Sequence, residues 1–169
     1  MPISHPAFLY QFKDMIDTVR LPDGTRRTIN IGRAYIRGLE LGIRKDLDRL
    51  SASINYTFLD HRNQTDDRPL DVIPRHLFQA EVSWVPLGSL RLTALGTAAS
   101  SSSWYDSNRQ AVLAVPAYFY LDAVLSYGGE WGEIYLKAGN IFDQSFFTEP
   151  GFPWPGRFLE LGFKIDVLR

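Results

Sequence analysis

Apolar and polar residues alternate with a period of two along much of this chain, and this pattern limits the folds that it can adopt. In residues 51–58, Ala, Ile, Tyr and Phe take every second position, with Ser, Asn and Thr between them. The same alternation recurs at 78–84, 119–127 and 159–167. A helix would mix the two kinds of residue on every face, whereas a strand places alternate residues on opposite faces. The pattern therefore predicts β-strands with one apolar and one polar face.

Eight such strands are predicted along the whole sequence, with no helix among them. Most are about as long as the roughly 9–11 residues that a tilted strand needs to cross a bilayer. The predicted strands are 7–18, 27–44, 50–61, 76–86, 89–100, 116–128, 131–142 and 157–167.

The connections between these strands alternate strictly between long and short. The short ones are 45–49, 86–89 and 128–130, and the long ones are 19–26, 60–75, 99–115 and 143–156. Outer-membrane barrels have short periplasmic turns and longer extracellular loops, whereas a soluble sandwich has no reason to gather its long loops at one end. We therefore predict an all-β fold: an antiparallel up-and-down transmembrane β-barrel segment.

The two faces of the predicted strands support this fold. The polar face carries charged and amide side chains that a water-filled lumen accepts and a dry core does not: Glu40, Arg44, Asn55, Glu81, Asp122, Glu133 and Lys164. An inner aromatic girdle beside the short turns is predicted at Trp84, Tyr127 and Trp131. The alternative is a soluble β-sandwich or lipocalin-like barrel with its apolar side inward.

Composition excludes several classes of function. The 18 basic and 19 acidic residues give a net charge of −1, so no basic surplus indicates nucleic-acid binding. Cysteine is absent, which excludes a disulfide, a thiolate nucleophile and a zinc–thiolate site within this chain.

Short motifs occur near the ends of several predicted strands. Toward the C-terminus they are Asn140, Phe142 and Asp143, followed by Gly151, Pro155, Gly156 and Arg157. Upstream they are Gly38-Leu39-Glu40, Tyr56-Thr57, Pro74-Arg75-His76, Leu121-Asp122 and Ser126-Tyr127. In this order, and over nearly the whole chain, they resemble the C-terminal barrel strands of TonB-dependent outer-membrane receptors.

The resemblance implies a receptor in the outer membrane of a Gram-negative bacterium that imports a scarce nutrient, such as an iron–siderophore complex, cobalamin or a similar ligand. It implies contact with outer-membrane lipid, the barrel-assembly machinery and, through a missing N-terminal region, TonB. We expect residues 1–169 to form the C-terminal part of the barrel, with the plug domain and N-terminal strands absent. At the position where the family usually ends in an aromatic residue, this chain has Val167.

Two other functions remain open. One is a free-standing eight-stranded outer-membrane barrel with a structural or binding role, because eight strands can close a small barrel. The other is a soluble lipocalin-like binder or an enzyme on a β-scaffold.

Ligand contacts are predicted from side chains in the long connections: Trp104, Tyr105, Arg109, Phe146, Phe147, Phe152 and Trp154. The alternative is that these residues pack the loops together or form an outer aromatic girdle. No catalytic residue, metal site or cofactor is expected. Asp60, Asp66, Asp67 and Asp71 gather near His61, but their spacing fits no calcium loop.

Three further patterns are interpreted as structural. Ser100–Ser103 lacks the Gly-x-Ser-x-Gly context of a nucleophile, and Glu81, Asp122 and Glu133 are interpreted as lumen lining. The glycines at 38, 42, 139 and 162 fall inside predicted strands, where we expect them to permit bulges or tight curvature.

Overall fold

The computed structural model describes residues 3–4, 6–14, 16–21, 23–30, 32–106, 109–130 and 132–165. None of these residues belongs to a helix long and apolar enough to cross a membrane. The strands are β1 (Ile3–Ser4), β2 (Ala7–Lys13), β3 (Ile16–Arg20), β4 (Arg26–Asn30), β5 (Arg33–Asp46), β6 (Leu50–Asn63), β7 (His76–Leu87), β8 (Leu90–Ala99), β9 (Ser102–Asp106), β10 (Ala111–Val115), β11 (Tyr118–Gly129), β12 (Gly132–Gly139), β13 (Phe147–Glu149), β14 (Phe152–Pro153) and β15 (Phe158–Ile165).

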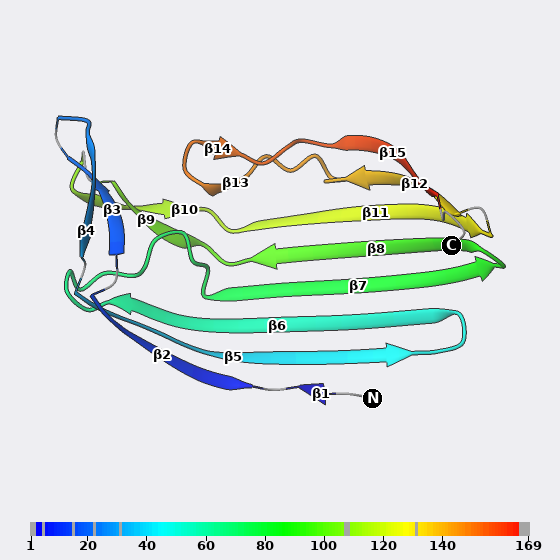
Figure 1. The fold of residues 1–169 in the computed structure, drawn as a ribbon, viewed down its shortest axis with the longest axis horizontal. Helices are drawn as coiled ribbons and strands as arrows, with labels where there is room; N and C mark the ends of the chain where they lie inside the picture. Colours follow the sequence, from blue (N-terminus) through cyan, green and yellow to red (C-terminus); the bar gives the residue numbers. More distant parts are fainter. Residues whose placement is uncertain are drawn as a thin grey trace.

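One antiparallel sheet of nine strands dominates the structure (Figure 1). Its order is β1-β5-β6-β7-β8-β11-β12-β15, and β2 pairs with β5 beside β1. Each long strand therefore lies next to the long strand that follows it in the chain, which is up-and-down topology. The eight predicted strands are confirmed as the eight long strands of this sheet.

The long and short connections lie at opposite ends of the sheet, as predicted (Figure 1). The tight β5–β6, β7–β8 and β11–β12 turns lie at one end. At the other end, small two-stranded sheets extend three of the long connections: β3 with β4, β9 with β10, and β13 with β14. The predicted loop at 19–26 is therefore too long, because β3 and β4 continue into it. The two strands are joined where the Leu21 amide donates to the Thr25 carbonyl at 2.8 Å.

The predicted strands 7–18 and 27–44 are each divided in two, and the predicted strand 131–142 ends early. Asp14 and Gly32 adopt positive φ angles of 59° and 73°, and the Asp14 amide donates to the Gly32 carbonyl at 2.6 Å. This pair separates β2 from β3 and β4 from β5, so the β3–β4 hairpin turns away from the sheet (Figure 1). Likewise β12 stops at Gly139, because Asn140 has a φ of 46° and leaves the extended conformation.

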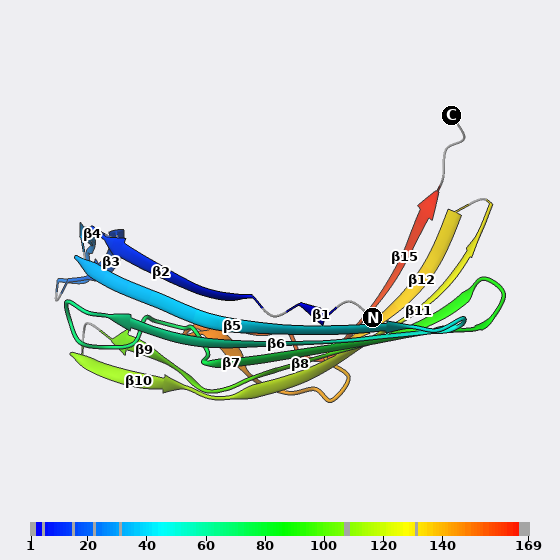
Figure 2. The same cartoon turned by 90° about the horizontal axis from the view of Figure 1, so that it is seen from below.

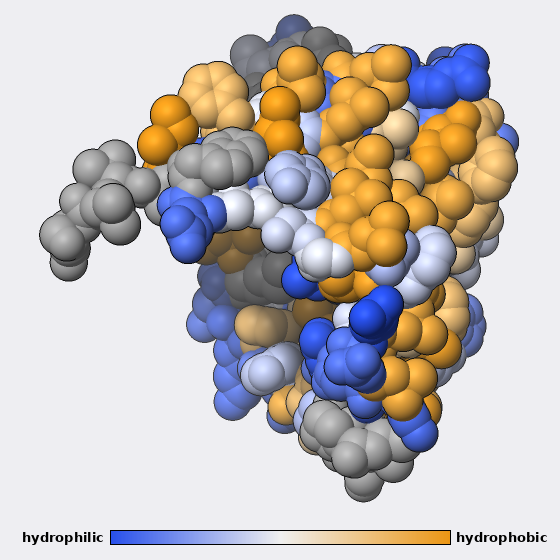
Figure 3. Space-filling view, turned by 90° about the vertical axis from the view of Figure 1, so that its right-hand side faces the viewer, coloured by the Kyte–Doolittle hydropathy of each residue, from blue (hydrophilic) through white to orange (hydrophobic). Residues whose placement is uncertain are grey.

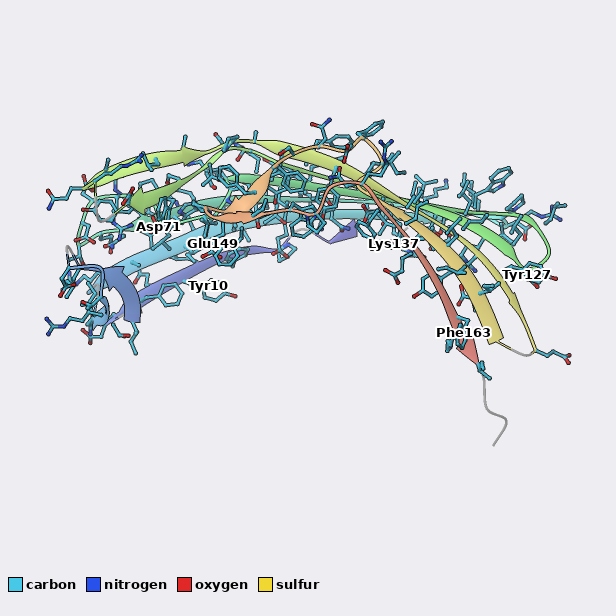
Figure 4. The ribbon with its side chains drawn as sticks, turned by 90° about the horizontal axis from the view of Figure 1, so that it is seen from above. Tyr10, Asp71, Tyr127, Lys137, Glu149 and Phe163 are labelled. Carbon is cyan, nitrogen blue, oxygen red and sulfur yellow. The ribbon has the colours of Figure 1, made fainter. Side chains whose placement is uncertain are left out.

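The sheet curves into an open arc, with β2 near one edge and β15 at the other (Figure 2). Cross-strand register places one row of residues on each face. The row Ile43, Ile54, Ala80, Gly96 and Leu121 is apolar, and its neighbour is Arg44, Ser53, Glu81, Leu95 and Asp122. Figure 4 places Tyr10 and Lys137 on the concave side of the arc and Tyr127 on the convex side. The polar face is therefore the concave one, and the predicted lumen-facing residues are confirmed.

Burial in this sheet is the reverse of burial in a soluble barrel. On the convex face Trp84 is 48% exposed, whereas on the concave face Ser83 is 5% exposed. Apolar side chains gather over the convex side of the wall (Figure 3). This surface suits lipid and contradicts the lipocalin-like alternative, whose apolar side would face inward. Trp84 and Tyr127 lie on this face near the short turns, as predicted for the inner girdle, while Trp131 lies outside the described residues.

The glycines inside the strands do not form bulges, so that part of the prediction was wrong. The pairing runs without a register shift through Gly38, Gly42, Gly139 and Gly162. Instead, an aromatic ring from the partner strand covers three of them: Phe8 lies over Gly38, Phe158 over Gly139 and Tyr135 over Gly162. A side chain on any of the three would collide with that ring, which explains why glycine occupies these positions.

Candidate functional site

The long connections come together at the outer end of the sheet. A small apolar core lies beneath the β6–β7 loop (residues 64–75), where Leu70 packs with Ala34. Partly buried side chains surround this pair: Phe12, Ile29, Ile36 and Ile73. The loop is therefore attached to the β2–β5 region of the wall.

Asn63 fixes the start of the same loop. Its side-chain oxygen accepts hydrogen bonds from the amides of Thr65 (2.9 Å) and Asp66 (3.2 Å), and its amide nitrogen donates to the Asp66 carboxylate at 2.9 Å. The side chain is fully buried. Because both of its polar ends are satisfied, Asn63 holds a tight turn directly after β6.

Asp71 connects the β6–β7 loop to the β9–β10 hairpin. Its Oδ1 accepts hydrogen bonds from the Arg68 guanidinium (2.9 Å) and from the Tyr105 amide (3.1 Å). The Arg68 guanidinium also lies 4.6 Å from the centre of the Tyr105 ring, and the Val72 amide donates to the Ser103 carbonyl at 2.7 Å. Tyr105, a predicted ligand contact, thus packs one loop against another.

The aspartates near His61 are paired with arginines. Asp60 binds Arg37 and Asp67 binds Arg62, each at 2.7 Å, and Asp66 lies 3.6 Å from Arg68, which also binds Asp71. No group of three or more metal-ligating side chains converges within the described ranges. Guanidinium groups occupy the carboxylates that a calcium ion would need.

His61 is buried beneath this loop in a defined tautomer. The Leu70 amide donates to Nδ1 at 3.1 Å, so Nε2 carries the proton and donates to the Ile73 carbonyl at 3.0 Å. Burial lowers the pKa of His61, and the nearby Arg75 cation acts in the same direction, whereas the hydrogen bond to Ile73 opposes them. Burial therefore favours the neutral form of the ring.

A stack of four aromatic rings lies where β11 meets the β12–β15 connection. Phe146 is buried against Tyr118, with ring centres 4.6 Å apart and planes 8° from parallel, and against Tyr120 at 5.5 Å. Trp154 closes the stack at 5.6 Å from Phe146 and 5.7 Å from Tyr120. Trp154 remains 40% exposed, so the stack presents an aromatic edge at the mouth of the concave side.

Tyr118 and Tyr120 were missed as candidate site residues. The alternation in β11 could have identified them. Both lie an even number of residues from the lumen-facing Asp122, so they share its face, and both lie nearer the outer end of the strand. Phe146 could not be placed in this way, because it belongs to an irregular connection.

Asn140 ties together the two ends of the β12–β15 connection. Its side-chain amide donates to the carbonyls of Gln144 (2.9 Å) and Pro155 (3.1 Å), and its oxygen accepts from the Gln144 amide at 3.0 Å. Its own backbone amide donates to Asp122 at 2.8 Å. The motif residue Asn140 therefore has a structural role.

Asp143 closes the same connection at its far end. Its Oδ1 accepts a hydrogen bond from the Arg157 amide at 2.7 Å, and a Cβ on Gly156 would come within 3.0 Å of that oxygen. Gly151 has a φ of 87°, a conformation that favours glycine. Phe142 is exposed beside Phe119, 5.9 Å between ring centres, on the convex face.

The remaining predicted contacts are dispersed. Trp104 lies in β9 opposite Leu113, and Arg109 forms an ion pair with Asp106 at 3.5 Å. Phe147 lies in β13 opposite Pro153, and Phe152 in β14 is exposed. The structure thus brings Phe146 and Trp154 together, and does not place the other predicted contacts in their stack.

Asp122 and Ser100, which the sequence analysis interpreted as structural, also have bonding partners in the structure. Asp122 lies 3.6 Å from the Lys137 ammonium group and accepts the Asn140 amide, so it connects β11, β12 and the loop motif. The Ser100 hydroxyl donates to the Ser101 carbonyl and accepts from the His76 amide. These contacts account for both residues without an enzymatic role.

A curved antiparallel sheet with an apolar convex face, a charged concave face and elaborate loops at one end defines the wall of an outer-membrane β-barrel. Sequence comparison agrees: the family model for the TonB-dependent receptor-like β-barrel matches residues 7–141. The chain belongs to this family. The family consists of receptors and transporters, and its barrels lie in the outer membrane of Gram-negative bacteria.

Solved structures share the fold at low sequence identity. The siderophore receptor PirA from Acinetobacter baumannii is 16% identical with a TM-score of 0.74, over 92% of this chain and 28% of that one. A double mutant of the ferric enterobactin receptor PfeA from Pseudomonas aeruginosa is 20% identical with a TM-score of 0.74, over 93% and 28%. The copper transporter OprC is 18% identical with a TM-score of 0.71, over 92% and 28%. The chain therefore spans about 28% of the length of these structures.

Proposed function

We propose that this chain forms the C-terminal barrel wall and several outer loops of a receptor that imports a scarce nutrient as an organic complex, such as an iron–siderophore or cobalamin. The aromatic stack at the mouth of the concave side carries this proposal. Its exposed Trp154 edge offers a planar apolar surface of the kind that holds a ligand ring. The role requires no catalytic residue.

The proposed receptor includes strands and a plug domain beyond this chain, and the plug region contacts TonB. The open arc supports this part of the proposal, because unpaired strand edges are not stable in lipid. The free-standing eight-stranded barrel is less well supported, because β2 and β15 lie at different edges and do not pair with each other.

The test is ligand binding and uptake by cells that produce the receptor, with a panel of radiolabelled ferric siderophores and cobalamin. We expect one ligand to be imported, and import to stop in a strain that lacks TonB. We expect Trp154→Ala to weaken binding of that ligand roughly 2- to 10-fold, the usual contribution of one aromatic pair.

Phe152→Ala is the matched control, because Phe152 is an exposed aromatic residue of the same connection outside the stack. Equal losses for both variants would exclude the stack as the ligand surface. Import that continues without TonB would contradict the receptor mechanism itself.

A further inference from the structure

We propose that the convex face of β2, β5 and β6 holds an anionic, phosphate-bearing lipid of the outer leaflet. The site is a groove of about 760 Å³ whose lining lies mostly on the membrane side of the wall. Its apolar half includes Leu9, Leu39 and Phe58, and its polar half includes Gln11, Tyr35 and Arg37.

The order of these residues along the strands matches a lipid that enters from the membrane. On β5, the convex-facing positions from the inside outward are Leu41, Leu39, Arg37, Tyr35 and Arg33. The apolar band therefore ends between Leu39 and Arg37, where hydrocarbon gives way to headgroups. An acyl chain would contact the apolar half, and its headgroup would lie beside Arg37.

Cations beyond this boundary supply the charge complementarity. Lys13 and Arg33 are direct cross-strand partners with exposed side chains. Within the described part of the chain, neither forms an ion pair. Two like charges opposite each other destabilise a strand pair unless an anion lies between them. Arg37 is 65% exposed although it binds Asp60, so its guanidinium remains accessible from the membrane side.

A phosphate is the anion that fits this position. Arginine and lysine bind phosphate oxygens with charge-assisted hydrogen bonds, and basic residues at a membrane surface attract anionic headgroups. This inference rests on the location of the barrel in the outer membrane and not on the proposed nutrient. If the receptor imported no chelate, the lipid-site proposal would not be affected.

The test uses the protein extracted from outer membranes into dodecyl maltoside and stripped of lipid by extended washing. Binding of lipopolysaccharide and of zwitterionic phosphatidylethanolamine is titrated at low salt. We expect lipopolysaccharide to bind more tightly, and its affinity to fall with added NaCl because screening weakens the charge contacts. Lys13→Gln with Arg33→Gln should weaken its binding about 30-fold, which is about 2 kcal/mol for two surface cations.

The control variant is Arg27→Gln with Lys45→Gln, which removes the same charge at exposed positions away from the groove. It should bind lipopolysaccharide like the unmodified protein. Equal affinity for the two lipids, or equal losses in the two double variants, would overturn the proposal.

Discussion

Buried polar side chains, each with a complete set of partners, hold the outer loops of this protein. Asn63 and Asn140 are both fully buried, and each bonds with its side-chain nitrogen and its side-chain oxygen. Asparagine suits these positions because it tolerates left-handed φ angles and can satisfy neighbouring backbone groups. At Asn140, where φ is 46°, both properties are used.

Asn140→Ala should destabilise the β12–β15 connection by roughly 3 kcal/mol. The change leaves the carbonyls of Gln144 and Pro155 and the Gln144 amide without their partner, and it places alanine at a left-handed φ angle. Thermal unfolding in detergent and trypsin cleavage in the loop would measure the effect. Gln144→Ala is the control, because Gln144 takes part through its backbone. Equal destabilisation by both changes would contradict this role.

His61 should make the β6–β7 loop sensitive to pH. Its position beyond the Arg37–Asp60 pair places it outside the apolar band. Since its pKa is lowered by folding, its stabilising effect is complete above the ordinary value of 6.5 and is lost as pH falls toward the lower, folded pKa. Protonation at Nδ1 would also break the bond from the Leu70 amide.

Amide exchange at Leu70, corrected for the intrinsic rate, would test this prediction between pH 7.5 and 5. We expect protection to decrease in the acidic range, and His61→Gln to abolish the pH dependence. Protection that declines equally in the variant would assign the effect to another group.

At the scale of elements, the β6–β7 loop and the β9–β10 hairpin behave as one unit because Asp71 bonds to both. The contact is partly buried, with the Arg68 side chain 11% exposed and that of Asp71 31% exposed. Partial burial makes such a pair stronger than a surface ion pair. The β7–β8 pairing holds only the bases of these two connections side by side, so the contact at Asp71 fixes how their outer parts lie against each other.

Arg68→Gln with Asp71→Asn should uncouple the two connections. The chain has no cysteine, so spin labels can be attached at Gln64→Cys and Val112→Cys without further changes. We expect a narrow distance distribution in the otherwise unmodified protein and a broad one in the double variant. Arg62→Gln breaks an ion pair between β6 and the β6–β7 loop, away from the β9–β10 hairpin, and should leave the distribution narrow. Broadening by both changes would argue against a specific link.

At the scale of the whole molecule, the wall is organised by which solvent each face meets. Ile54 and Asn55 are neighbours in β6, yet Ile54 faces lipid and Asn55 faces the lumen. An arginine near the middle of the lipid-facing side costs about 2–4 kcal/mol, whereas lumen positions tolerate charge. We expect Ile54→Arg to reduce the heat-resistant folded fraction in outer membranes, and Asn55→Arg to leave it nearly unchanged. Similar losses for both would contradict the assignment of the faces.

The alternation of residues determined the strands, their faces and the end at which the long loops lie. The side-chain period of a strand is two, and a shift of one residue would move every apolar side chain of β6 from lipid to water. The local pattern therefore carries this information by itself. The alternation also indicated that Tyr118 and Tyr120 face the lumen. The ligand site was nevertheless predicted among the aromatic residues of the loops.

Only the tertiary structure decided which loop residues meet. The bonds of Asp71 to Tyr105 and of Asn140 to Pro155, like the packing of Phe146 on Tyr118, join residues far apart in the chain. Such contacts leave no periodic signal, because irregular connections have no repeating geometry from which a side-chain direction follows. The role of the glycines inside the strands was likewise decided by tertiary contacts. A glycine within a strand can indicate a bulge, and only the position of Tyr135 shows that Gly162 makes room for a ring.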